Sequence, residues 1–229
     1  VRRYLFIAVM LGGVLFLQKD LGMLMLFVLS CLIILLISGL PARHFAKVAG
    51  AAVAAGAGFV LLRHERILAW LAPMDHLDGA GYHIMNCKLA IARGAGLGLG
   101  VGQSPEKWYS LPFPQTDSIF CVWAAETGLW GTFALLLVFA ALAWYTYTVA
   151  SRATNPVHSL LAAGCGFLVC TQAAVNMAVA TNLIPPTGLT LPFVSYGRTS
   201  LVGSALAIAV VLWVAQRTRP QKPAQSQTP

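Results

Sequence analysis

The chain has 229 residues, of which 58% are hydrophobic and only 10% charged, and its formal net charge is +8. A soluble domain carries about a quarter charged residues, so this composition predicts an integral membrane protein and argues against nucleic-acid binding. The five cysteines contain no C-x-x-C pair and lie mostly in apolar runs. We interpret them as core residues rather than as metal ligands or disulfide partners.

Six apolar segments predict an all-α, polytopic membrane protein with about six transmembrane helices. The first segment is short for a span. The fourth is too long for one untilted span, because a helix rises about 1.5 Å per residue and the hydrocarbon core is about 30 Å thick. We therefore predict a break near Thr127–Gly131. In chain order the predicted segments are Tyr4–Leu17, Gly22–Leu40, Phe45–Leu62, a short leading helix Ser118–Glu126 followed by Leu129–Ala150, then Leu160–Leu183 and Leu201–Ala215.

The charges predict which side of the membrane each connection faces. An even number of spans places both chain ends on one side, and about half of the fifteen Lys and Arg residues but none of the seven acids fall there. The positive-inside rule makes that side cytoplasmic. The large loop Arg63–Asp117 and the segment Pro185–Ser200 then face outward. We expect one membrane domain over residues 1–215 and a disordered cytoplasmic tail over residues 216–229.

Glycine at alternate positions from 94 to 102 dominates the second half of the outer loop. The pattern matches neither G-x-G-x-x-G nor a P-loop, so it does not predict nucleotide binding. Glycines at this density allow the backbone to approach a ligand or another helix closely. A flexible loop at the membrane surface is the alternative, and the sequence does not separate the two.

Four cations in the outer segments could together bind an anionic lipid headgroup. They are Lys88, on the polar side of the amphipathic stretch Ile84–Ala92, and Arg93, Lys107 and Arg198. Cations on an outer surface are more often solvated or paired with nearby acids, so each alone is weak support.

The outer acids do not form a recognisable metal motif. Asp75 and Asp78 could bind a hard divalent cation together with Glu65 or Glu106, but their spacing fits no metal-binding loop. We interpret them as solvated loop residues. The histidines show no zinc-binding spacing either.

Asp117 stands at the mouth of a span, after two prolines and a threonine and before an apolar run. A charge at such a position is usually functional. We expect Thr116 to cap the following helix and Asp117 to lie in its first turn; a simple helix-start acid is the alternative. A partly desolvated carboxylate there could act as general base for a sugar hydroxyl. Glu126 would lie on the opposite face of a continuous helix, which favours a structural or gating role.

The fifth predicted span carries Gln172 and Asn176 one helical turn apart, on one face. Polar stripes of this kind mostly hold helices together in lipid, and a functional role for Asn176 is the alternative.

Three segments, in this order, resemble the SEDS family (shape, elongation, division and sporulation), the FtsW/RodA/SpoVE-type peptidoglycan polymerases. They are Gln18–Gly22, Leu111–Phe120 with Glu126–Gly128, and Pro185–Gly197. The resemblance covers nearly the whole chain. Because such proteins have ten spans, it implies that this chain corresponds to the C-terminal six, with a large extracytoplasmic loop.

The resemblance implies polymerisation of lipid II on the outer face of the inner membrane, with release of undecaprenyl pyrophosphate, in cell division or cell-shape maintenance. It places the essential loop aspartate of the family at Asp117, as the general base. Our own inference, from charge, is that Lys107 and Arg198, with Lys88, stabilise the departing pyrophosphate. We also expect Gln115 and Ser195 to contact substrate, and we expect structural or gating roles for Asp20, Glu126 and Asn176.

The same resemblance implies a class B penicillin-binding transpeptidase as partner, and it allows a divalent cation, Mg²⁺ or Mn²⁺, at the pyrophosphate. A flippase for the same lipid and a non-catalytic membrane scaffold are the alternative functions. The chain departs from the family pattern in several places: Lys19 replaces a proline, Gln115 a histidine, Ala125 a glutamate and Arg198 a glycine. Asp117 would therefore act with fewer neighbouring helpers.

Overall fold

The computed structural model describes residues 2–18, 21–38, 43, 46–50, 53, 64–76, 79–109, 111 and 114–218. Within these ranges the regular structure is helical and contains no β-strand, which confirms the predicted all-α class. Asp20, most of the predicted span Phe45–Leu62 and residues 219–229 lie outside the described residues. The elements are α1 (Arg2–Leu17), α2 (Leu21–Ile37), α4 (His64–Leu71), the 3₁₀ helix η1 (Pro73–Asp75), α5 (Ala80–Gly94), α6 (Glu106–Tyr109), α7 (Ile119–Arg152), α8 (Pro156–Ala180) and α9 (Arg198–Thr218).

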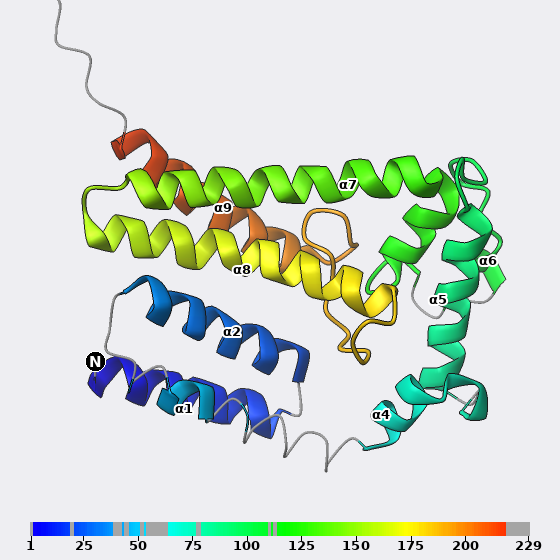
Figure 1. Cartoon of the computed structure of the whole chain (residues 1–229), viewed down its shortest axis with the longest axis horizontal. Helices are drawn as coiled ribbons and strands as arrows, with labels where there is room; N and C mark the ends of the chain where they lie inside the picture. The colour runs from blue at the N-terminus through cyan, green and yellow to red at the C-terminus, as the bar shows by residue number, and fades with distance from the viewer. Residues whose placement is uncertain are drawn as a thin grey trace, which may run out of the picture.

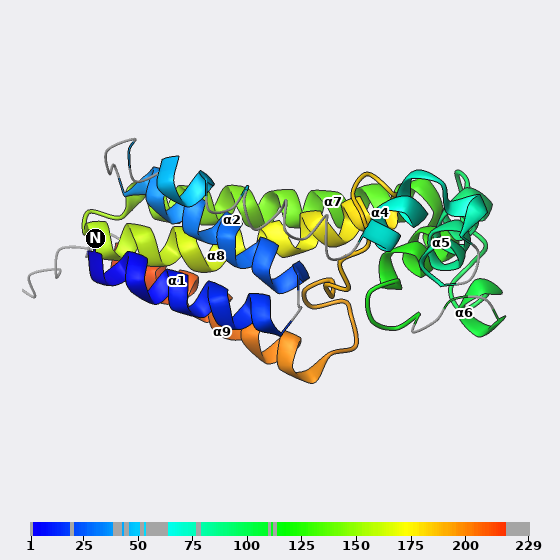
Figure 2. The ribbon, with the colours of Figure 1, turned by 90° about the horizontal axis from the view of Figure 1, so that it is seen from below.

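The helices form an elongated bundle with a separate cluster at one end. Helices α1, α2, α7, α8 and α9 run along the long axis, whereas α4, α5 and α6 gather beyond one end of the bundle (Figures 1 and 2). Helix α8 packs against α2, α7 and α9. Helix α1 begins and α9 ends at the opposite end (Figure 1). The outer-loop helices thus lie at the opposite end of the bundle from the start of α1 and the end of α9, as the charge pattern predicts.

Among the residues that the structure describes, three helices, α7, α8 and α9, are long and apolar enough to cross a membrane, and α2 carries a shorter apolar stretch, Gly22–Ile37. Alanines of α8 let α9 approach closely: Ala162 and Ala163 are buried against Val211 and Val214. Helix α9 continues to Thr218, so residues 216–218, which we predicted to belong to the tail, are helical.

Helix α7 is broken at Gly128, as the length of its apolar segment predicts. Gly128 has φ 65° and ψ −159°, far from helical values, so two helical segments meet there at a kink. A break of this kind leaves backbone N–H and C=O groups without their helical partners, and in a membrane protein these groups need partners from elsewhere in the chain. The glycine-rich loop supplies them.

The loop that follows α5 bonds directly to the broken segment of α7. The N–H groups of Leu99 and Gly100 donate to the carbonyls of Ala125 (2.9 Å) and Glu126 (3.0 Å), and the N–H of Leu129 donates to the carbonyl of Ala95 (3.1 Å). A Cβ atom on Gly94 would lie 2.1 Å from a backbone carbonyl oxygen of α7, and one on Gly98 would lie 2.3 Å from another, so this approach requires glycine at both positions. The glycine run therefore serves close packing against a helix, and the flexible-loop alternative is wrong for this part of it.

Candidate functional site

Asp117 precedes α7 rather than lying in its first turn. Ser118 occupies the N-cap position and the helix begins at Ile119, so the prediction that Thr116 caps this helix is wrong. The Thr116 hydroxyl instead donates to Asp117 Oδ1 (3.1 Å). The physical reason is that hydrogen bonds from α8 and from the loop after it occupy the backbone carbonyls of residues 115–117 and hold this segment in turns, so the helix starts only after Asp117.

Asn176 of α8 holds the backbone of Asp117 in place. Its side-chain Nδ2 donates to the carbonyl of Asp117 (3.0 Å) and to that of Leu189 in the loop between α8 and α9 (2.7 Å). Asn176 is only 1% exposed. A buried amide that bonds both segments fixes their relative position. Gln172, one turn earlier, donates to the carbonyl of Thr190 (3.0 Å), so the predicted polar stripe holds a loop rather than a neighbouring helix.

Ser195 and Gln115 join the same two loops. The Ser195 hydroxyl donates to the carbonyl of Thr116 (2.6 Å) and accepts from the N–H of Leu191 (2.7 Å). The N–H of Tyr196 donates to the carbonyl of Gln115 (2.8 Å), while the Gln115 side chain is exposed. Because the Ser195 hydroxyl is used within the protein, its geometry favours a structural role over direct contact with substrate.

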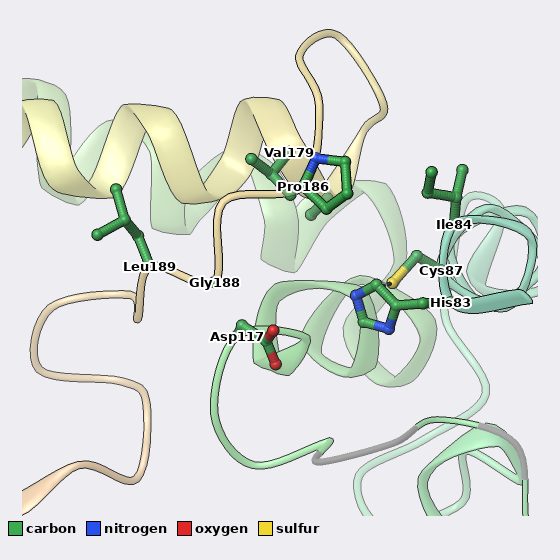
Figure 3. A pocket seen from close by; sticks show the side chains of 9 residues that line it. His83, Ile84, Cys87, Asp117, Val179, Pro186, Gly188 and Leu189 are labelled. Atoms are coloured by element: carbon green, nitrogen blue, oxygen red, sulfur yellow. Dashed lines mark hydrogen bonds between the residues drawn. The ribbon is translucent and has the colours of Figure 1, made fainter. Parts of the chain in front are cut away.

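The carboxylate of Asp117 faces a small pocket between α5, the end of α8 and the loop that follows it (Figure 3). His83 and Cys87 project into this pocket from α5 (Figure 3). The remaining wall is mostly apolar. The residues lining the pocket are His83, Ile84, Cys87, Asp117, Val179, Ala180, Pro186, Gly188 and Leu189.

His83 is the functional candidate that sequence reasoning missed. The hydrogen bond with the Cys87 sulfur raises the pKa of His83 and the negative charge of Asp117 adds to the effect, whereas burial opposes it. The spacing of His83 and Cys87, one helical turn apart, signals that they share a face. That this face meets Asp117 depends on how α5 packs, which local sequence does not reveal.

The four outer cations do not line this pocket. Lys107 lies with its Nζ 3.8 Å from Glu126 Oε1, and Arg93 pairs with Glu106. Lys88 and Arg198 are exposed. The geometry therefore separates the cations into two that are paired with acids and two that are open to an anion.

Glu106 and Arg93 form a half-buried ion pair that anchors the loop between α5 and α7. Arg93 Nη1 lies 2.5 Å from Glu106 Oε1, and the Ser104 hydroxyl donates to Glu106 Oε2 (3.1 Å). The Glu106 side chain is 1% exposed, whereas that of Arg93 is 49% exposed. Glu106 is thus a structural acid and not a solvated loop residue.

Replacing Arg93 by alanine should destabilise the protein by about 3 kcal/mol, because it leaves a buried carboxylate without its counter-charge. The measurement is the midpoint of thermal unfolding in detergent. Lys88→Ala is the matched control, since Lys88 is an exposed cation on the same helix and should change the midpoint little. Equal midpoints for the two variants would contradict the anchoring role.

The described residues do not fit a preformed divalent-cation site. Among them no group of three or more His, Cys, Asp or Glu side chains is placed to hold a metal ion. Glu106, one of the acids considered for such a site, is bonded to Arg93 and Ser104.

Comparison with known proteins gives the family. The FtsW/RodA/SpoVE family, described as "Cell cycle protein", matches residues 1–220. The chain belongs to the FtsW/RodA/SpoVE family. Stage V sporulation protein E of Bacillus subtilis is 35% identical over 205 residues, which cover 88% of this chain and 56% of that protein. The probable peptidoglycan glycosyltransferase FtsW of Halomonas elongata is 33% identical over 223 residues, 95% of this chain and 56% of that protein.

Solved structures share the fold of this chain. A chain of a peptidoglycan synthase complex that coordinates polymerization and crosslinking superposes with a TM-score of 0.74 at 27% identity, covering 95% of this chain and 61% of that one. RodA, the rod shape determining protein of Thermus thermophilus, superposes with a TM-score of 0.61 at 25% identity, covering 95% and 56%. The chain thus spans about half the length of the curated relatives it matches.

Proposed function

We propose that the protein is the part of a peptidoglycan polymerase that carries the catalytic aspartate. The enzyme transfers the disaccharide-pentapeptide of lipid II to a growing glycan chain. The observation that carries the proposal is Asp117 itself: its backbone is fixed by a buried amide, and its carboxylate faces a pocket shared with His83. Relatives described as peptidoglycan glycosyltransferases support the same reaction.

In this reaction Asp117 acts as general base. Its carboxylate takes the proton of an acceptor sugar hydroxyl, the hydroxyl oxygen forms the new bond to the donor's anomeric carbon, and the bond to pyrophosphate breaks. Undecaprenyl pyrophosphate leaves. A general base typically contributes about 10²–10⁴-fold to the rate. His83 supplies a second titratable group in the same pocket, where it can orient the hydroxyl in place of the histidine that Gln115 replaces.

The protein acts at the outer face of the inner membrane. The positive-inside rule places the Asp117 end of the bundle outside the cell. The exposed cations Arg198 and Lys88 are open to an anionic group there, and we assign the departing pyrophosphate to these two side chains. The partner is a class B penicillin-binding transpeptidase, in keeping with the synthase complex whose chain shares this fold.

A flippase for the same lipid is the second candidate, and the structure favours polymerisation over it. A transport path needs polar groups through the middle of the membrane. The two conspicuous amides of α8, Gln172 and Asn176, are instead bonded to loop carbonyls at the outer end. A pure scaffold for a transpeptidase would need neither Asp117 nor the pocket.

The proposal is tested with the full-length protein and its transpeptidase in liposomes that contain labelled lipid II. We expect glycan polymer. Labelled lipid that crosses the bilayer without forming polymer would favour the flippase, and neither product would favour the scaffold. In the same assay, replacing Lys88 and Arg198 together by alanine should raise the KM for lipid II at least tenfold. An unchanged KM and kcat would contradict the pyrophosphate role.

A further inference from the structure

Cys87 places a thiol in the wall of the Asp117 pocket. Its sulfur lies 3.9 Å from His83 Nε2 on the same face of α5, and both side chains project toward the space that Asp117 faces (Figure 3). Cys87 is 4% exposed and is the one cysteine among the described residues that line this pocket. A thiol beside an imidazole is the arrangement that activates cysteine as a nucleophile.

The other described cysteines are placed differently and provide internal controls. Cys121, in the first turn of α7, is fully buried and its thiol donates to the carbonyl of Ala180 (4.0 Å). Cys165 and Cys170 lie within α8, and Cys31 is buried in α2. A reagent that enters the pocket should therefore label Cys87 faster than it labels the other described cysteines.

We propose that Cys87 is a thiol-modification site for small disulfides and related sulfur electrophiles, and that its modification closes the pocket beside Asp117. The first part stands on the geometry of Cys87 and His83. The second part rests on the proposed function, because a blocked pocket matters only if an acceptor hydroxyl must reach Asp117. A methylthio group on the Cys87 sulfur would occupy the space between α5 and the Asp117 loop.

The chemistry is thiol–disulfide exchange. The proton of the Cys87 thiol passes to His83, and the thiolate attacks one sulfur of the incoming disulfide or thiosulfonate. A new S–S bond forms at Cys87 as the S–S bond of the reagent breaks and its other half leaves as the anion. The oxidising equivalent comes from the reagent, and an added thiol such as dithiothreitol reverses the step.

The local electrostatics favour this reaction near neutral pH. The neighbouring Cys121 thiol and His83 lower the pKa of Cys87 to about 6, although burial and the negative charge of Asp117 oppose the shift. Because the thiolate is the reacting form, reactivity is present above this pKa and is lost as the pH falls through it. An ordinary thiol, with a pKa of about 8.5, would instead gain rate steadily up to pH 8.

The test uses the full-length protein in detergent with methyl methanethiosulfonate, followed by peptide mass spectrometry of every cysteine. We expect Cys87 to be labelled at least tenfold faster than Cys121, with a rate that levels off above pH 7, and His83→Gln to slow labelling of Cys87 but not of Cys165. Labelling of Cys87 no faster than that of Cys121 would overturn the site. This readout does not depend on polymerase activity, so it stands apart from the proposed function.

The second measurement is lipid II polymerisation before and after labelling, each variant compared with its own untreated rate. Labelling should lower the polymerisation rate of the wild type at least tenfold, and dithiothreitol should restore it. The rates of Cys87→Ser and Cys87→Ala should stay the same before and after treatment. Full labelling of Cys87 with unchanged polymerisation would overturn the blocking role.

Discussion

Gly98→Ala should abolish most of the folded protein, whereas Gly96→Ala should leave the yield near that of wild type. A Cβ atom on Gly98 would lie 2.3 Å from the carbonyl oxygen of Glu126, at a φ of +80° that side chains rarely adopt. The contact is with backbone that is itself bonded to this loop, so neither side can move away. Overpacking and backbone strain together should cost about 3–5 kcal/mol, a large part of a total stability of about 5–15 kcal/mol.

Each variant is heated in detergent, and the fraction of protein that remains monodisperse is then measured by size-exclusion chromatography. Gly96 is a matched control because it lies in the same loop and does not have a positive φ. A Cβ atom added to Gly96 would meet no other atom within 4 Å. Gly128→Ala should behave like Gly98→Ala, since its Cβ would lie 2.4 Å from the backbone nitrogen of Gly98. Equal survival of Gly98→Ala and Gly96→Ala would show that the loop does not need its close approach to α7.

The spans and the break in α7 could be predicted from the sequence because they depend on local quantities. Hydropathy marks α8 and α9, and helix rise against membrane thickness requires a break in the segment that contains Gly128. The purpose of the glycine run could not be predicted. It depends on the distance between the loop and α7, which is a property of the folded chain.

The site was only partly predictable for the same reason. Asp117 stands out because an acid at the mouth of a span is rare. His83 and Asn176 reach it from α5 and α8, and only the packing of those helices brings them together. The cap at Thr116 was predicted wrongly because contacts from α8 and its following loop delay the start of the helix. The pairing of Arg93 with Glu106 likewise required the folded loop.

Asp117→Asn should lower lipid II polymerisation at least 100-fold without lowering the affinity for lipid II. The amide has nearly the shape of the carboxylate and keeps an acceptor oxygen for the Thr116 hydroxyl, but it cannot take a proton. The bond from Asn176 is to the backbone carbonyl of Asp117 and survives the substitution. The expected loss is within the range of about 10²–10⁴-fold for a general base. The measurement is the initial rate of glycan formation with saturating lipid II.

Asp75→Asn provides the control, because Asp75 is an exposed acid of the outer loop and should leave the rate unchanged. A thermal midpoint equal to that of wild type would show that Asp117→Asn is folded. The most direct test of the general-base role is the single-turnover rate of polymerisation by these proteins with lipid II prebound. We expect Asp117→Asn to bind lipid II normally and to react at least 100-fold more slowly than wild type. A rate within twofold of wild type would mean that Asp117 is not the general base.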